Sequence, residues 1–169
     1  MARSQAAGRP RATEEPDQAL LGRLYPVLRR FAAVVAPIEL SPDDLLQQAL
    51  LLALRRQALA GYSDPEAYLK KTMLNLASNE RRRLGRQRKA LSRIPLVNQA
   101  QATSYPSDLS DLLRLPPVSR AVLYLAEVED HSYSEIARLL GVSEVRARAT
   151  ASRARRKLRL EVGEEVHNG

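Results

Sequence analysis

Apolar residues recur at steps of three and four along most of this 169-residue chain, and this spacing limits the folds that it can adopt. An α-helix turns once every 3.6 residues, so such steps place apolar side chains on one face, whereas a half-buried strand needs strict alternation. The chain has no convincing stretch of alternation. We therefore predict an all-α fold with almost no strand.

Helix start and stop signals divide the chain into segments. A first helix is expected from near Asp17 to Pro37, with Pro26 as a possible kink. Ser41-Pro42 and Asp64-Pro65 open the next two helices, because a capping residue followed by proline suits a first turn. The second helix is expected to stop near Gly61, and the third to run into the arginines at 81–83.

Beyond Gly85 the periodic pattern dissolves, which is typical of a linker. Two helices are then predicted at 108–115 and 117–129, separated by Pro116-Pro117. The predicted organisation is two small helical domains joined by a flexible linker. Its parts are a disordered leader at 1–16, a first domain at 17–84, a linker at 85–107, a second domain at 108–160 and a tail at 161–169.

Positive charge is concentrated in two windows. Of the 27 Lys and Arg residues, 14 lie at 80–93 and 146–159, where Glu80 is the only acid; the rest of the chain has 13 basic and 18 acidic residues. A solvated basic face is the plain alternative. Because the arginine fork can bond two phosphate oxygens at once, we favour contact with a polyanion.

Several classes of function are not expected from the composition. The chain has no Cys and only His131 and His167, which excludes a thiolate or His-rich metal site. It has no nucleophile elbow and no phosphate-binding glycine loop, so we expect neither an enzyme nor a cofactor. Without a signal peptide or an apolar run of roughly 18 to 20 residues, we expect a cytoplasmic protein that does not insert into membranes.

The segment from His131 to Arg159 has the layout of a helix-turn-helix. Ser132 and Glu135 have capping-box spacing, Gly141 suits the turn, and Ser143 can cap the next helix. An ordinary helical hairpin with a basic face is the alternative. The basic second helix favours DNA contact in the major groove. This pattern predicts Arg146, Arg148 and Arg153 as base readers or phosphate contacts.

This segment, YSEIARLLGVSEVRARATASRARRKL, resembles the helix-turn-helix of the extracytoplasmic-function (ECF) sigma factors, group 4 of the sigma-70 superfamily. The usual pattern there is YxEIAxxLGxSxGTVxSRxxRARxxL, in a winged-helix-like domain. Val145-Arg146 replace the usual Gly-Thr pair, Ala147 replaces a larger aliphatic residue, and Thr150 replaces an arginine. The resemblance leaves open which bases this segment reads.

The first half resembles the same family. SPDDLLQQALLLALRR is similar to the tract DAEDLxQExFLxxWR, and DPEAYLKKTMLNLASNERRRLGR is similar to FRxWLxxIAxNxxxDxxRR. Together the matches cover residues 20–160 in the family's order. They imply a sigma factor that binds core RNA polymerase through the β′ clamp helices and the β flap, and that is monomeric when free. An anti-sigma factor is the further partner expected from the family.

The resemblance also implies three sets of functional residues. The polymerase-binding set is Asp43, Asp44, Gln47 and Gln48. The set that reads the minus-ten promoter element as single-stranded DNA is Tyr62, Asn75, Asn79, Arg81, Arg82 and Arg83. The set that binds the minus-thirty-five element as duplex is Ser143, Arg146, Arg148, Ser152, Arg153, Arg155 and Arg156. Of these, Arg148, Ser152 and Arg153 are expected to read bases, and Arg146, Arg155 and Arg156 to contact phosphates. Stacking of Tyr62 on a base has an equal alternative, in which this ring only covers the edge of the core.

Two other functions stay open at this point. A helix-turn-helix repressor or activator would bind duplex operators as a dimer. A sigma-like adaptor would bind polymerase without reading DNA. The promoter, the regulon and the inducing signal are not predicted.

Overall fold

The computed structural model describes residues 14–91 and 112–165. Three ranges lie outside this part of the chain: 1–13, 92–111 and 166–169. They fall in the predicted leader, in and around the predicted linker, and in the predicted tail. All regular elements of the described residues are helices, and none is a strand. The predicted all-α fold is therefore confirmed.

Helix α1 (Glu14–Val35) begins three residues before the predicted start and continues through Pro26. Proline in a helix interior costs about 3 kcal/mol. Burial of the following turns offsets this cost, because Leu28 and Phe31 are fully buried.

Helix α2 (Pro42–Leu54) starts where predicted, and the Ser41 hydroxyl accepts a hydrogen bond from the Asp44 N–H. The prediction that it continues to Gly61 is wrong, because a turn and the short 3-10 helix η1 (Leu59–Gly61) follow Leu54. The carboxylate of Asp17 accepts the backbone N–H groups of Leu59 and Ala60, both at 2.9 Å. The start of α1 therefore holds this segment away from a helical path.

Helix α3 (Pro65–Leu91) is longer than predicted and passes through Gly85. The first seven residues of the predicted linker are therefore helical. A glycine in a helix interior costs about 1 kcal/mol, and the surrounding Arg, Gln, Lys, Leu and Ala residues are strong helix formers that outweigh it.

The second half contains a short helical stretch at 112–114, then α5 (Pro117–Glu127), α6 (Tyr133–Leu140) and α7 (Glu144–Glu165). The predicted helix at 108–115 is described only from residue 112. Helix α5 lies where expected, and α7 continues five residues beyond the predicted end at 160. Residues 112–165 have no strand, so the helix-turn-helix has no wing there.

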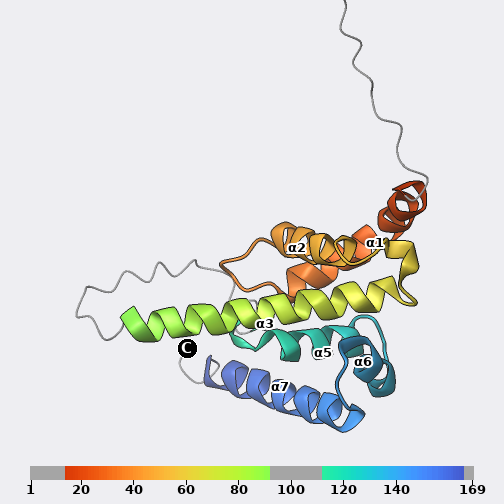
Figure 1. The fold of residues 1–169 in the computed structure, drawn as a ribbon. Coiled ribbons are helices and arrows are strands. Elements are labelled where there is room, and N and C mark those ends of the chain that lie inside the picture. Colours follow the sequence, from red (N-terminus) through yellow and green to blue (C-terminus); the bar gives the residue numbers. More distant parts are fainter. Residues whose placement is uncertain (1–13, 92–111, 166–169) are drawn as a thin grey trace, which may run out of the picture.

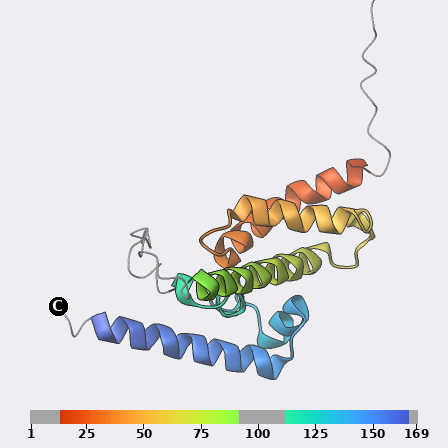
Figure 2. The same ribbon diagram turned by 60° about the vertical axis from the view of Figure 1, so that its left-hand side comes forward.

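The two halves pack against each other along α3. Figure 1 shows α1 and α2 on one side of α3 and α5, α6 and α7 on the other, and Figure 2 shows the same order. The buried side chains form one continuous core, in which the Phe31 ring of α1 meets the Tyr124 ring of α5 edge to face at 6.4 Å. Helix α7 packs on α5 and α6 through Ala147, Ala151 and Ala154. Because the halves share a core, the domain boundaries remain a prediction.

Cationic side chains cross between the halves. The guanidinium of Arg120, only 2% exposed, donates to the carbonyls of Val35 and Ala36 at the end of α1, each at 3.1 Å. Burial, with a smaller contribution from the charge of Arg81, lowers the pKa of Arg120 to about 10. The fully buried Lys70 pairs with Glu129 of the second half at 2.8 Å.

Candidate nucleic-acid interface

The turn between α6 and α7 is built by two capping residues and a glycine. The Ser132 hydroxyl accepts the Glu135 N–H at 3.3 Å, and the Glu135 carboxylate accepts the Ser132 N–H at 2.8 Å. The Ser132 hydroxyl also donates to the Glu135 carboxylate at 2.8 Å, and this hydrogen bond, followed by the one from the Ser132 N–H, lowers the pKa of Glu135. The Ser143 hydroxyl then accepts the Arg146 N–H at 3.2 Å and starts α7. The predicted helix-turn-helix is confirmed.

Gly141 meets two requirements at once. Its φ of 66° is in the left-handed region, which closes α6 and is strained for residues that have a Cβ. A Cβ at this position would also lie 2.5 Å from Nζ of Lys71 on α3. The end of the Lys71 side chain, from the first half of the chain, therefore lies against the turn.

The exposed face of α7 has a strip of small side chains between basic residues. Val145, Ala149 and Ser152 lie at positions i, i+4 and i+7, so they share one line along the helix, and all are exposed. By the same helical spacing, Arg148 lies on one side of this small-residue strip, and Arg146 and Arg153 on the other. A helix with this face can approach a groove closely while its arginines reach phosphates.

The predicted minus-thirty-five residues differ in their partners. Arg155 bonds to Glu127 of α5 and donates to the Tyr133 hydroxyl at 2.9 Å, so it also joins α7 to its neighbours. Arg148 bonds to Glu144 at 2.6 Å and lies over the Tyr133 ring, 5.0 Å from the centroid. Four residues of this predicted set are exposed, and their side chains have no hydrogen-bond partner among the described residues: Arg146, Ser152, Arg153 and Arg156.

The departures from the family pattern separate into two kinds. Ala147 and Thr150 are buried against the rest of the helix-turn-helix, so they can affect its packing and not a DNA surface. Val145 and Arg146 are exposed. Only these two of the replaced residues are able to change what α7 contacts.

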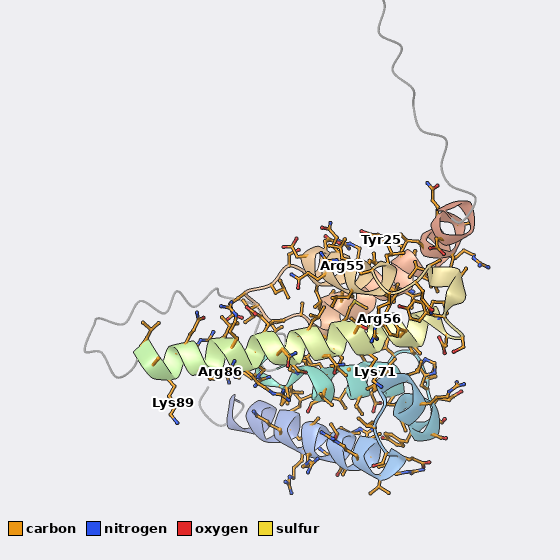
Figure 3. All side chains as sticks on the ribbon, in the orientation of Figure 1. Tyr25, Arg55, Arg56, Lys71, Arg86 and Lys89 are labelled. Carbon is orange, nitrogen blue, oxygen red and sulfur yellow. The ribbon has the colours of Figure 1, made fainter. Side chains whose placement is uncertain are left out.

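The basic cluster of α3 also has an exposed face. Asn75, Asn79 and Arg82 lie at positions i, i+4 and i+7 and are all exposed, with the Arg82 guanidinium 3.4 Å from the Asn79 amide oxygen. The sequence prediction did not include Lys71, Arg86 and Lys89, which lie along the same helix in Figure 3. The sequence could have indicated Arg86, because it lies at i+11 from Asn75 and so continues the helical spacing of this face.

Two arginines of this cluster do not join that face. Arg81 donates to the carbonyls of Leu115 at 2.5 Å and Arg114 at 3.0 Å, which lie in the second half. Arg83 pairs with Glu80, whose pKa it lowers mainly through a side-chain hydrogen bond. The structure therefore does not bring the predicted minus-ten residues into one group.

Tyr62 lies in the segment before α3, at the edge of the core. Its hydroxyl donates to the Ala53 carbonyl at 2.9 Å, and its ring packs on Tyr68 with centroids 4.2 Å apart. Both contacts fix its orientation. One ring face is therefore already covered inside the protein.

The outer face of α2 combines polar and apolar side chains. Asp44, Gln47 and Gln48 are exposed as predicted for a binding surface. Asp43 instead pairs with Arg29 at 2.9 Å and lies near the Tyr25 hydroxyl, on the side of α1. The sequence prediction missed the exposed apolar residues Leu51, Leu52 and Leu54. The run LLLAL at 50–54 could have indicated them, because five consecutive apolar residues cannot all lie on the buried side of a helix.

Other kinds of site find no support in the described residues. They contain no group of three or more His, Cys, Asp or Glu side chains placed to hold a metal ion. Within 14–91 and 112–165, every helix is too short or too polar to cross a bilayer.

Comparisons with known proteins agree with this geometry. The family model described as Sigma-70, region 4 matches residues 112–158, which include α5, α6 and most of α7. A solved structure of the sigma factor RpoE from Bartonella quintana, in complex with the anti-sigma factor NepR, has a similar fold, with a TM-score of 0.66 at 22% identity. The similarity covers 88% of this chain and 98% of that one. No curated protein matches the chain in sequence.

The match to region 4 falls on the helix-turn-helix whose capped turn and basic second helix are described above. The similar fold extends over the first half as well. Residues 112–158 thus match region 4 of the sigma-70 factors, in agreement with the family that the sequence predicted.

Proposed function

We propose that this protein directs core RNA polymerase to promoters by reading the minus-thirty-five element with α7 and the minus-ten element with α3 and the segment before it. The observation that carries the proposal is the exposed basic face of α7 within the region 4 match. A helix presented in this way by a preceding helix and a tight turn fits the major groove of duplex DNA.

The roles of the α7 residues follow from their positions. Ser152, in the small-residue strip, and Arg153, beside it, are proposed to contact base edges, together with Arg148 once it leaves Glu144. Arg146 and Arg156, which have no partner among the described residues, are proposed to bind phosphates. Ser143 caps the helix, and Arg155 contributes mainly by holding α7 on α5.

The minus-ten element is proposed to follow the exposed face of α3. Asn75 and Asn79 offer amides for unpaired bases, and Arg82 and Arg86 offer charge for the phosphates. Arg83 lies beside this face, whereas Arg81 can join only if it leaves its carbonyl partners. Stacking of a base on Tyr62 would use the ring face that Tyr68 leaves uncovered.

Polymerase binding is proposed for the outer face of α2. Asp44, Gln47 and Gln48 supply polar contacts for the β′ clamp helices, and the exposed leucines beside them supply apolar area. Asp43 acts by orienting Arg29 rather than by direct contact. Region 4 would meet the β flap.

The remaining partners follow from the same proposal. The similar RpoE structure was solved with an anti-sigma factor, which supports such a partner for this chain. The protein would act in the cytoplasm as a monomer before it joins polymerase. Neither catalysis nor a cofactor is part of this proposal.

Run-off transcription tests it directly. Core polymerase is incubated with genomic fragments from the source organism, with and without the protein, and transcript 5′ ends are sequenced. We expect discrete start sites only when the protein is present. A dimeric repressor would bind a palindrome alone and start no transcription, and an adaptor would bind polymerase without new start sites. Either result would refute the proposal.

A further inference from the structure

Val145 is an exposed apolar side chain at the start of the recognition helix. It is 77% exposed, and it belongs neither to the buried core nor to the side chains that pack against it. A β-branched residue in a helix costs a few tenths of a kcal/mol relative to straight-chain residues, and here burial within the chain does not offset this cost. The side chain is therefore available to a partner.

The surroundings of Val145 identify that partner as the floor of a DNA groove. Val145 begins the small-residue strip that continues through Ala149 and Ser152, with Arg148 on one side and Arg146 and Arg153 on the other. Arginines on both sides of the strip, which reach base edges and phosphates, would hold the strip over the base pairs. The first residues of a recognition helix are those that meet base edges.

The chemistry of valine restricts what it can read there. It has neither a hydrogen-bond donor nor an acceptor, so it cannot distinguish bases by their polar pattern. The apolar group on the major-groove edge of unmodified DNA is the C5 methyl of thymine. We propose that Val145 selects a T·A pair in the duplex element by contacting this methyl group.

This inference rests on the proposed function and adds a specificity determinant to it. Glycine, the usual residue of the family at this position, has no side chain that could make the contact. The atypical pair Val145-Arg146 would then have two separate roles. Arg146 would strengthen binding to any sequence, and Val145 would restrict the sequence that is bound.

The test compares thymine with uracil, which differs from it only by the C5 methyl. Holoenzyme made from core polymerase and the full chain selects duplexes from a randomised library, and the enriched duplex is resynthesised with uracil at each thymine in turn. At one position we expect about fourfold weaker binding, the ratio typical of one buried methyl group. Val145→Ser is expected to bind the thymine and uracil duplexes equally at that position.

The matched control is Val128→Ser, which alters another exposed valine, 66% exposed at the end of α5 and away from the strip. This variant should keep the fourfold ratio. Equal binding of all uracil duplexes by the wild-type protein would overturn the inference, as would a fourfold ratio that persists in Val145→Ser. If no duplex is enriched by the wild-type holoenzyme, the proposed function fails, and this inference fails with it.

Discussion

Arginines between the two halves of the molecule and arginines on the outer face of α7 have the same chemistry but differ in their hydrogen-bond partners. Arg120 and Arg81 donate to backbone carbonyls across the interface between the halves. Arg146 and Arg153 are exposed, and their side chains have no hydrogen-bond partner among the described residues. The first pair satisfies carbonyls of this chain, and the second pair is available to phosphates and bases.

This difference shows why a basic run cannot be assigned to DNA as a whole. The windows at 80–93 and 146–159 contain seven basic residues each. In both, some arginines bond to other parts of the protein, as Arg81 and Arg155 do, and others, such as Arg86 and Arg153, have no side-chain hydrogen bond among the described residues. The number of basic residues in a window therefore overestimates the DNA contacts that it makes.

The largest effect on stability is expected at Arg120, the buried arginine between the halves. Arg120→Met should lower the free energy of unfolding by about 3 kcal/mol, because two buried carbonyls lose a charged donor. Urea unfolding measures this change. Arg138→Met, at an exposed position of α6, should change the stability by less than about 0.5 kcal/mol. An equal midpoint for Arg120→Met and wild type would contradict the proposed role of this arginine.

The second prediction separates two neighbouring arginines of α3. Arg81→Ala should cost about 1.5 kcal/mol of stability, since it removes two charge-assisted hydrogen bonds to the second half. Arg82→Ala, on the exposed face, should cost less than about 0.5 kcal/mol and should weaken binding to single-stranded minus-ten DNA instead. Both are checked by urea unfolding and by fluorescence anisotropy of the holoenzyme with labelled DNA. Equal losses of stability in Arg81→Ala and Arg82→Ala would contradict the different roles given to these two arginines.

The third prediction concerns the outer face of α7. Arg153→Ala should leave stability within about 0.5 kcal/mol of wild type, because this side chain is exposed and has no hydrogen-bond partner among the described residues. If Arg153 contacts a phosphate, the slope of log affinity against log salt should fall by about 0.9 for every duplex. If it reads a base, the slope should persist and preference at one position should relax. Binding that is unchanged in both respects would exclude Arg153 from the interface.

The smallest effect is a pH dependence of the interface between the halves. Burial alone would raise the pKa of Glu129, but the hydrogen bond and charge of Lys70, together with smaller contributions from Tyr124 and His131, lower it. Because the folded pKa lies below the unfolded value, the stabilisation is present above about pH 4.5 and is lost as pH falls through the folded pKa. Thermal unfolding from pH 6 to pH 3 should therefore show a shallower loss for Glu129→Gln than for wild type. If the stability of both proteins fell equally with pH, the Lys70–Glu129 pair would not contribute to the pH dependence.

Local signals in the sequence predicted the parts of the fold that depend on neighbouring residues. Ser132, Glu135 and Gly141 form the predicted cap and turn, and Ser41 caps α2. The end of α2 was predicted incorrectly because it depends on Asp17, which is 42 residues from Leu59 in sequence. No local pattern contains that contact.

As with the fold, only the part of the candidate site that depends on local sequence could be predicted. Helical spacing and charge predicted the exposed face of α7. They could not show that Arg155 bonds to Glu127, or that Arg81 bonds to Leu115, because both partners lie about 30 residues away along the chain. Packing of the second half on α1 and α3 determines which basic residues already have partners within the protein.

The most direct test of the central claim is run-off transcription with a charge-matched pair of double variants. Arg146→Ala with Arg153→Ala removes two arginines from the outer face of α7, and Arg23→Ala with Arg138→Ala removes two exposed arginines from α1 and α6. The account predicts that wild type and the second double variant start transcription at the same discrete sites, whereas the first loses most of this initiation. Equal initiation by both double variants, or none by wild type, would contradict it.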